Sequence, residues 1–134
     1  MLTLDTSGLY AILNRADPHH TACLAARNAD RGPYFVPVAT MSELAYLIER
    51  DLGLPTLSAL LRDIDTGMYT LDCGETNLAR IDALVHRYAN LPLGFTDAAA
   101  IACAESHGGR VLSTDRRDFD IVAAEGKIAV LPEH

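Results

Sequence analysis

Short apolar runs alternate along the whole chain with segments long enough to form helices. Runs of this length are typical of buried β-strands, and a strand, a helix and a second strand in succession form the repeating unit of α/β folds. The alternation therefore predicts an α/β sandwich around a mostly parallel sheet. The predicted strands cover 2–5, 34–38, 68–71, 110–114 and 127–131.

Helix starts and helix breakers define six helices between these strands. Thr40 and Glu43 have the spacing of a capping box, and Thr96 is the predicted cap of the last helix. Pro37 indicates that its strand lies at a sheet edge or ends there, because proline cannot donate a hydrogen bond to a neighbouring strand. The predicted helices cover 6–15, 18–31, 41–52, 55–66, 75–88 and 97–107.

Length and charge limit the functions open to the chain. Its 134 residues fit one domain spanning 1–134, and a hydrophobic fraction of 49% argues against wholesale disorder. Acidic residues outnumber basic ones by 18 to 11, giving a net charge of −7, and no basic patch stands out. This balance argues against a passive electrostatic binder of nucleic acid. The same charge balance is compatible with an enzyme that binds phosphate through a bound cation.

The cysteines and the apolar segments indicate the cellular compartment in which the protein works. Cys23, Cys73 and Cys103 are too few and too scattered for a disulfide framework, so we expect small buried residues of a reducing environment. Asp5 interrupts the apolar N-terminal stretch and no basic residue precedes it, unlike a signal peptide. No run approaches the roughly 18 apolar residues of a membrane helix. The sequence therefore predicts a cytoplasmic protein with no membrane partner.

Four acidic residues stand at special positions in this pattern. Asp5 and Asp115 stand at the ends of predicted strands, whereas Glu43 and Asp97 fall in the first turns of predicted helices. In an open parallel sheet, the carboxyl ends of the strands and the starts of the following helices share one edge, where ligands bind. The four carboxylates are therefore predicted to converge at that edge.

A structural interpretation accounts for these acids when each is taken alone. The helix dipole stabilises an acidic side chain in the first turn by roughly 0.3–1 kcal/mol, which explains Glu43 or Asp97 singly. Four anions at one edge repel one another, however, and raise some carboxyl pKa values unless a cation is bound. The joint pattern therefore predicts a divalent metal site, whose all-oxygen ligands favour Mg²⁺ or Mn²⁺ over zinc.

Each of the four acids lies in a longer segment of distinctive sequence. These segments are LDTSGLYAIL at 4–13, MSELAYLI at 41–48, FTDAAAIACAE at 95–105 and STDRRDF at 113–119. They resemble the four blocks of a PIN domain and, more narrowly, the chain is similar over essentially its whole length to the VapC ribonuclease toxins of bacterial toxin–antitoxin pairs. This resemblance implies a three-layer α/β/α sandwich with a mostly parallel central sheet, and a Mg²⁺-dependent endoribonuclease that hydrolyses RNA phosphodiester bonds.

The resemblance implies catalytic roles for Asp5, Glu43, Asp97 and Asp115, one from each block. Because Mg²⁺ usually takes only one or two protein carboxylates directly, we expect Asp5 and Asp97 to be the metal ligands. Glu43 and Asp115 are expected to hold metal-bound waters, to complete a second metal site, or to orient the nucleophile. Asp118 occupies a position that is acidic in some family members and not in others, and we expect it in the outer shell of the site.

Neighbouring residues complete the predicted site. Thr6 and Thr114 each flank one of the acids and are candidates for donating hydrogen bonds to it; helix capping is the alternative for Thr6. Arg116 and Arg117 are candidates for gripping an RNA phosphate. A solvated surface pair beside an acidic patch is an equal alternative for these arginines.

Aromatic residues and histidines are expected to be structural. Tyr10 and Phe119 lie near the acids in sequence, but such positions more often hold core aromatics than platforms for base stacking. Four of the five histidines, taken together, lack metal-ligand spacing with one another and are expected at the surface or at helix ends. These four are His19, His20, His86 and His107.

The resemblance also implies partners. A VapB-like DNA-binding antitoxin is expected to lay its C-terminal tail over the acidic pocket, and family members commonly form homodimers. Two alternatives keep the fold: a housekeeping PIN nuclease that matures structured RNA without an antitoxin, and a PIN-shaped binding module with little nuclease activity. The intact acids argue against the binding module. A phosphoacceptor domain fits poorly, because Asp5 lacks a second acid two residues on and Lys127 is the only lysine.

Overall fold

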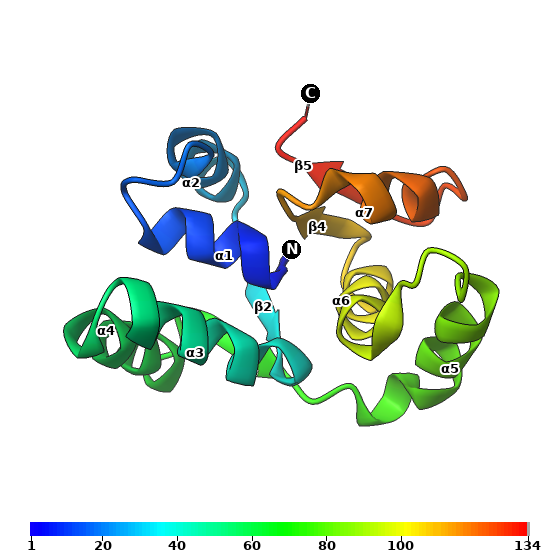
Figure 1. Cartoon of the computed structure of the whole chain (residues 1–134), viewed down its shortest axis with the longest axis horizontal. Helices are drawn as coiled ribbons and strands as arrows, with labels where there is room; N and C mark the ends of the chain where they lie inside the picture. Colours follow the sequence, from blue (N-terminus) through cyan, green and yellow to red (C-terminus); the bar gives the residue numbers. More distant parts are fainter. Residues whose placement is uncertain (134) are drawn as a thin grey trace.

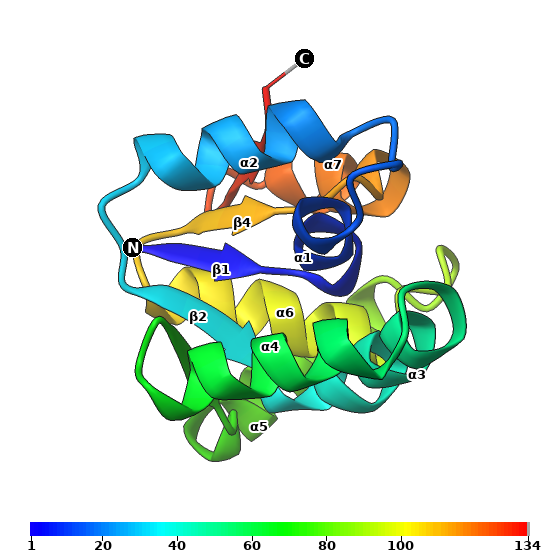
Figure 2. The ribbon, with the colours of Figure 1, turned by 90° about the vertical axis from the view of Figure 1, so that its left-hand side faces the viewer.

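Five parallel strands form one sheet in the order β3-β2-β1-β4-β5 in the computed structural model, which describes residues 1–133. Figure 2 shows β1, β2 and β4 running side by side in the same direction. The predicted mostly parallel sheet is therefore confirmed. The strands are β1 (Leu2–Leu4), β2 (Tyr34–Pro37), β3 (Tyr69–Asp72), β4 (Arg110–Leu112) and β5 (Ala129–Leu131).

Helices cover both faces of this sheet, so the predicted three-layer α/β/α sandwich is confirmed (Figure 1). Helices α1 to α4 pack on one face and α5 to α7 on the other, each set over its own apolar core. Across residues 1–133, no helix combines the length and hydropathy that a membrane span requires. The helices are α1 (Thr6–Leu13), α2 (His20–Ala29), α3 (Met41–Asp51), α4 (Leu54–Asp65), α5 (Leu78–Arg87), α6 (Gly94–Ser106) and α7 (Arg116–Ala123), with short 3-10 turns η1 (Val38–Thr40) and η2 (Glu75–Asn77).

The strand side chains alternate between the two cores. Leu2 and Leu4 of β1 enter the core beneath α1 to α4, whereas Thr3 between them contacts Cys103 of α6 on the opposite face. In β4, Val111 and Leu112 likewise belong to different cores. Because both faces of the sheet are covered, the strands are almost continuously apolar, which is why short apolar runs located them in the sequence.

Some predicted boundaries differ from the structure. Pro37 ends β2, so the strand-end alternative is confirmed, and the edge alternative is wrong because β2 lies between β1 and β3. Helix α6 begins at Gly94 rather than Asp97, and Thr96 therefore lies inside the first turn and is not the cap. Helix α7 was not predicted, because its first turn is polar and only Phe119 and Val122 are buried along it.

Two expectations about single residues are also wrong. Thr40 stands at the N-cap position of α3 as predicted, but its hydroxyl donates to the Pro37 carbonyl at 2.8 Å and makes no capping hydrogen bond, so Thr40 and Glu43 do not form a capping box. Cys23 and Cys103 are buried as expected, but Cys73 is exposed because it follows the end of β3, beyond the apolar core.

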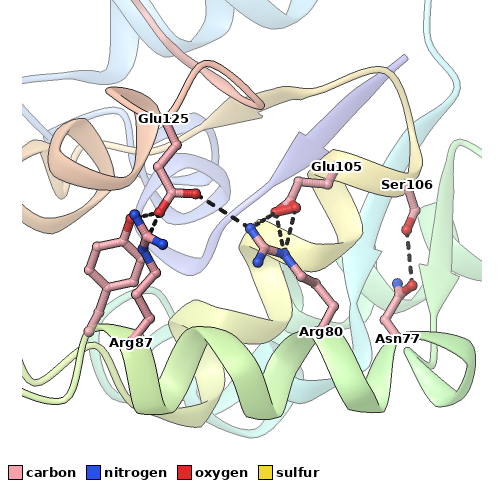
Figure 3. Close-up of polar contacts among 7 residues, drawn as sticks. Asn77, Arg80, Arg87, Glu105, Ser106 and Glu125 are labelled. Carbon is pink, nitrogen blue, oxygen red and sulfur yellow. Dashed lines mark hydrogen bonds and ion pairs between the residues drawn. The ribbon is translucent and has the colours of Figure 1, made fainter.

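Ion pairs join the helices on the α5–α7 face (Figure 3). Arg80 of α5 lies 2.9 Å from the Glu105 carboxylate of α6 and 3.6 Å from that of Glu125, which follows α7. Arg87 of α5 contacts Glu125 at 2.6 Å. These partly buried pairs fix α6 and the end of α7 relative to α5, and both α6 and α7 contribute acids to the site described next.

Candidate active site

The site lies where the strand order reverses. From β1 the chain passes to β2 and β3 on one side of the sheet, and it then crosses to β4 and β5 on the other side. Open parallel sheets bind ligands at the carboxyl ends of the strands beside such a reversal. The Asp5 N–H donates to the Leu112 carbonyl at 3.0 Å, so the residue that follows β1 lies directly beside the end of β4.

Two serines orient the Asp5 carboxylate, which is only 4% exposed. Ser113 donates to its Oδ2 at 3.0 Å and Ser7 donates to the same oxygen at 3.3 Å. The two hydroxyls lie 3.1 Å apart, and the Ser7 hydroxyl also accepts the Thr114 N–H. Neither serine was among the predicted site residues. Their signal was position alone, because each lies two residues from a predicted catalytic acid.

Gly8 permits the close approach of α1 to β4 that this arrangement requires. A Cβ at position 8 would lie 2.3 Å from the Leu112 carbonyl oxygen, which is far inside van der Waals contact. Any larger residue would push the start of α1 away from the end of β4. The glycine was part of the first block quoted above, but its role depends on a tertiary contact that the sequence does not reveal.

A second group of acids comes from the starts of α6 and α7. Asp97, Asp115 and Asp118 each offer a carboxylate oxygen, and these oxygens all lie within 4.8 Å of one another. Asp97 stands in the first turn of α6, and Asp118 in the first turn of α7. Asp118, which we expected in the outer shell, therefore lies among the central acids.

The electrostatics show that these carboxylates crowd one another. Burial raises the pKa of Asp97 to about 7, and repulsion from Asp5, Asp115, Asp118 and Glu43 adds to the effect. Burial also raises the pKa of Asp5 to about 6, with a smaller contribution from Asp115, although the Ser113, Thr6 and Ser7 hydrogen bonds act in the opposite direction. All four acids of the sequence analysis therefore influence one site.

Three other predicted residues occupy the periphery. Glu43 is exposed in the first turn of α3 and reaches the site through its charge. Thr6 donates its backbone N–H to Asp5, whereas its buried hydroxyl has no hydrogen-bond partner within residues 1–133. Thr114 contributes its backbone N–H to Ser7. The side-chain hydrogen bond expected from Thr6 to Asp5 is therefore absent from the described structure.

The two predicted phosphate-binding arginines differ in environment. The Arg116 guanidinium donates to the backbone carbonyls of Val130 and Pro132 at 3.0 and 2.5 Å, and it pairs with Asp120 at 3.1 Å. The Arg117 side chain is 82% exposed and lies 3.6 Å from Asp118. Arg116 therefore anchors the last strand, and Arg117 keeps its guanidinium available beside the acids.

The nearby aromatic side chains are structural. Phe119 is fully buried, so it cannot stack on a base. The Tyr10 hydroxyl donates to Asp51 at 2.7 Å and accepts a hydrogen bond from Asn14 at 3.3 Å. Phe119 is therefore a core aromatic and Tyr10 a structural one, as the sequence predicted.

The donor set fits a divalent metal ion. It consists of carboxylate oxygens, and the buried Oδ1 of Asp118 has no hydrogen-bond partner among the described residues, although the Arg117 guanidinium lies 3.6 Å from it. Within residues 1–133, no lysine, arginine or histidine forms an ion pair with Asp5, Asp97 or Asp115. A bound cation would neutralise the repulsion among these carboxylates, and oxygen ligands suit hard divalent cations.

Comparison with known proteins agrees with this geometry. Ribonuclease VapC26 of Mycobacterium tuberculosis (strain ATCC 25618 / H37Rv) is 28% identical over 135 residues, which cover 98% of this chain and 100% of the relative. The crystal structure of Mycobacterium tuberculosis VapC20, described as a sarcin-ricin loop cleaving toxin, superimposes with a TM-score of 0.78 at 18% identity and covers 91% of this chain and 95% of its own.

A second solved structure supports the same fold. FitAcB from Neisseria gonorrhoeae superimposes with a TM-score of 0.63 at 20% identity, over 97% of this chain and 96% of its own. The family model of the PIN domain matches residues 2–125, which include every predicted catalytic acid. The resemblance inferred from the four sequence blocks is therefore confirmed, and the chain belongs to the PIN domain family.

Proposed function

We propose that the chain, as one nuclease domain over residues 1–134, is a metal-dependent endoribonuclease and the toxin of a toxin–antitoxin pair. The proposal is supported by the family and by the names of its relatives, a VapC ribonuclease and an RNA-cleaving VapC toxin. The observation that carries it is the meeting of Asp97 with Asp115 and Asp118 beside Asp5, with no basic partner for the first two in the described chain.

The acids divide into holding and orienting roles. Asp5 and Asp97 are the proposed metal ligands, and the position of Asp118 makes it a further candidate. Mg²⁺, with Mn²⁺ as a substitute, would lower the pKa of water and neutralise charge that develops on the phosphate. Glu43 and Asp115 would accept hydrogen bonds from water at the site and orient it toward the scissile phosphate. Ser7 and Ser113 hold Asp5 in position.

RNA contact must be local, because the chain carries a net charge of −7. Arg117 is the better placed of the two arginines to grip a phosphate, since its guanidinium is exposed and adjoins Asp118. Arg116 would have to give up hydrogen bonds to two backbone carbonyls before it could bind substrate. A cation at the acids and Arg117 beside them together present positive charge to a backbone phosphate.

The proposed partners follow from the same charge pattern. A VapB-like antitoxin with a basic residue in its C-terminal tail would satisfy the unpaired acids and block the site, because opposite potentials guide such docking. A homodimer is proposed from the family, and exposed apolar side chains on α4, Leu54 and Leu61, are available to such an interface.

The proposed function is tested by mapping the 5′ ends of cellular RNA after brief induction of the wild-type chain and of Asp5→Asn. We expect new ends at discrete positions in one class of RNA, together with growth arrest, from the wild type alone. Identical ends in both strains would refute the assignment of Asp5, and no new ends from the wild type would refute the nuclease. Co-expression of a small DNA-binding protein encoded beside the gene should restore growth.

A further inference from the structure

A second cluster of possible metal ligands lies at the other end of α6 from Asp97. Asp72 at the end of β3, Cys103 in α6 and His107 just after α6 each offer one ligand atom, and these three atoms all lie within 4.8 Å of one another. Asp97 and His107 are separated by about 15 Å along the axis of α6, since an α-helix rises 1.5 Å per residue. The cluster is therefore separate from the acidic site.

The His107 ring is held in place on both sides. Its Nε2 lies 2.7 Å from Oδ2 of Asp72, and its plane stacks on the Phe35 ring with the centroids 3.7 Å apart and an interplanar angle of 11°. Metal-binding histidines need this kind of orientation, because a ring that is already fixed loses little freedom when it binds an ion. The stack also explains why a histidine at a helix end is only partly exposed.

The Cys103 sulfur completes the cluster from inside the protein. The side chain is 1% exposed, and its Sγ lies 3.5 Å from the Thr3 hydroxyl. Burial raises the pKa of the Cys103 thiol to about 12, so the sulfur is protonated at neutral pH in the absence of metal. A metal ion that binds this sulfur must therefore displace its proton, and its affinity rises with pH.

An open cavity gives access to the cluster. Asp72 and His107 line a hollow of about 330 Å³ together with Phe35, Asn77 and Ser106. One nitrogen, one sulfur and one oxygen ligand form a mixed donor set of borderline softness, which suits Zn²⁺. Zinc sites with three protein ligands leave the fourth position to water, and this cavity has room for that water.

We propose that Asp72, Cys103 and His107 form a zinc site that joins the edge strand β3 to helix α6. On binding, the Cys103 sulfur loses its proton to solvent and forms the S–Zn bond, while the Asp72 carboxylate and the His107 ring nitrogen supply the other protein ligands. The site differs from the acidic site in its donors, since Mg²⁺ does not compete for sulfur and nitrogen. Its occupancy stabilises the fold and does not depend on nuclease activity.

The test is a titration of the purified full-length chain with Co²⁺ and then Zn²⁺, in excess Mg²⁺ to occupy the acidic site. We expect one equivalent of Co²⁺ to give a thiolate-to-cobalt charge-transfer band, one equivalent of Zn²⁺ to abolish it, and Zn²⁺ to raise the melting temperature. Cys103→Ser should lose the band, and it should weaken Zn²⁺ binding by more than about 100-fold, because removal of a ligand exceeds the loss seen for supporting residues.

Two variants make the result specific. Cys73→Ser removes an exposed thiol that lines the same cavity, and it should retain the band and the affinity. His107→Asn, which alters a partly exposed residue, should weaken Zn²⁺ binding like Cys103→Ser and provides the answer if the buried variant does not fold. The absence of a charge-transfer band in the wild type, or equal Zn²⁺ affinity in wild type and His107→Asn, would overturn the proposal.

Discussion

Two aspartates are buried at opposite edges of the same sheet, and their charges meet opposite environments. Asp5 at the carboxyl edge is 4% exposed and Asp30 at the amino edge is 5% exposed. Asp30 lies 3.3 Å from the terminal amine of Met1 and 3.4 Å from Arg110. Although burial alone would raise the pKa of Asp30, the Gly32 N–H, the amine and Arg110 together lower it. Asp5 has two serines and several other acids around it, but no cation in the described chain.

This difference separates a structural carboxylate from a functional one. Burial costs both residues their hydration, and at Asp30 the protein offsets that cost with its own positive charges. At Asp5 the protein adds further negative charge, which destabilises the fold unless a cation arrives from outside. This contrast supports the proposal that the carboxyl edge is organised for a ligand, and the amino edge for stability.

Exchanging one acid at each edge for its amide should separate the two roles most strongly. Asp97→Asn should lower RNA cleavage by more than about 100-fold, because it removes a proposed metal ligand. Asp30→Asn should leave the cleavage rate within about twofold, and it should lower the free energy of unfolding by about 1–3 kcal/mol because its hydrogen-bonded ion pairs are lost. Rates measured on one RNA and denaturant curves check both. Wild-type cleavage by Asp97→Asn would contradict the comparison.

The serines that hold Asp5 sharpen the comparison at the level of a single hydrogen bond. Ser113→Ala should reduce activity by about 10–100-fold, since it frees the carboxylate to rotate. The lost bond had lowered the pKa of Asp5, so the acidic limb of the pH–rate profile should also move to higher pH. Ser106→Ala, the same change at the far end of α6, is the control and should do neither. If the acidic limb of the pH–rate profile does not move in Ser113→Ala, Ser113 contributes only packing to the site.

The adjacent arginines extend the comparison to basic residues. Arg117→Ala should raise KM for RNA several-fold and reduce the salt dependence of binding by about one phosphate contact, with little change in stability. Arg116→Ala should instead cost about 1–3 kcal/mol of stability, because two backbone carbonyls lose a charged donor. Binding isotherms at several salt concentrations and unfolding curves distinguish them. If Arg116→Ala weakens RNA binding more than Arg117→Ala, the roles are reversed.

The pH dependence of stability should have opposite signs for Asp97 and Asp30, at the two edges of the sheet. The expected shifts in melting temperature are only a few degrees. The pKa of Asp97 is raised from 3.8 to about 7, so the folded protein keeps a proton that the unfolded chain releases, and Asp97 destabilises the metal-free fold increasingly as pH rises between these values. The pKa of Asp30 is lowered, so its stabilisation is present above 3.8 and is lost as pH falls through the folded value.

Melting temperatures across this pH range provide the measurement. Asp97→Asn should raise the melting temperature of the metal-free protein near neutral pH and change it little near pH 4. Asp30→Asn should lower the melting temperature near neutral pH, with the difference shrinking in acid. Parallel curves for the wild type and Asp97→Asn would show that neither burial nor repulsion from the other acids disfavours the charged form of Asp97.

Local rules in the sequence were sufficient for the sheet and for the convergence of the acids. Buried parallel strands are short and apolar, and parallel topology brings the residues that follow them to one edge, so Asp5 and Asp115 could be placed together. Helix α7 was not predicted because its polar first turn resembles a loop. The start of α6 was misplaced because Thr96 is a residue type that often caps helices, although here it lies inside the first turn.

The finer contacts of the site could not be predicted, because they depend on tertiary geometry. Nothing local distinguishes Ser113, which donates to Asp5, from an ordinary surface serine. Gly8 looks like a helix-weakening residue until the Leu112 carbonyl is seen beside it. The same holds for Asp30, whose partners Met1 and Arg110 come from two other segments of the chain. Residue chemistry was visible in the sequence, but the pairing of residues was not.

The central claim is that the carboxyl edge of the sheet requires a divalent cation to act on RNA. The most direct test measures RNA cleavage by the purified chain after treatment with EDTA, and again as Mg²⁺ or Mn²⁺ is restored, with Asp30→Asn as a control for the fold. We predict no cleavage in chelator and full recovery with either cation, in both the wild type and the control. Cleavage that continues unchanged in EDTA would contradict the account.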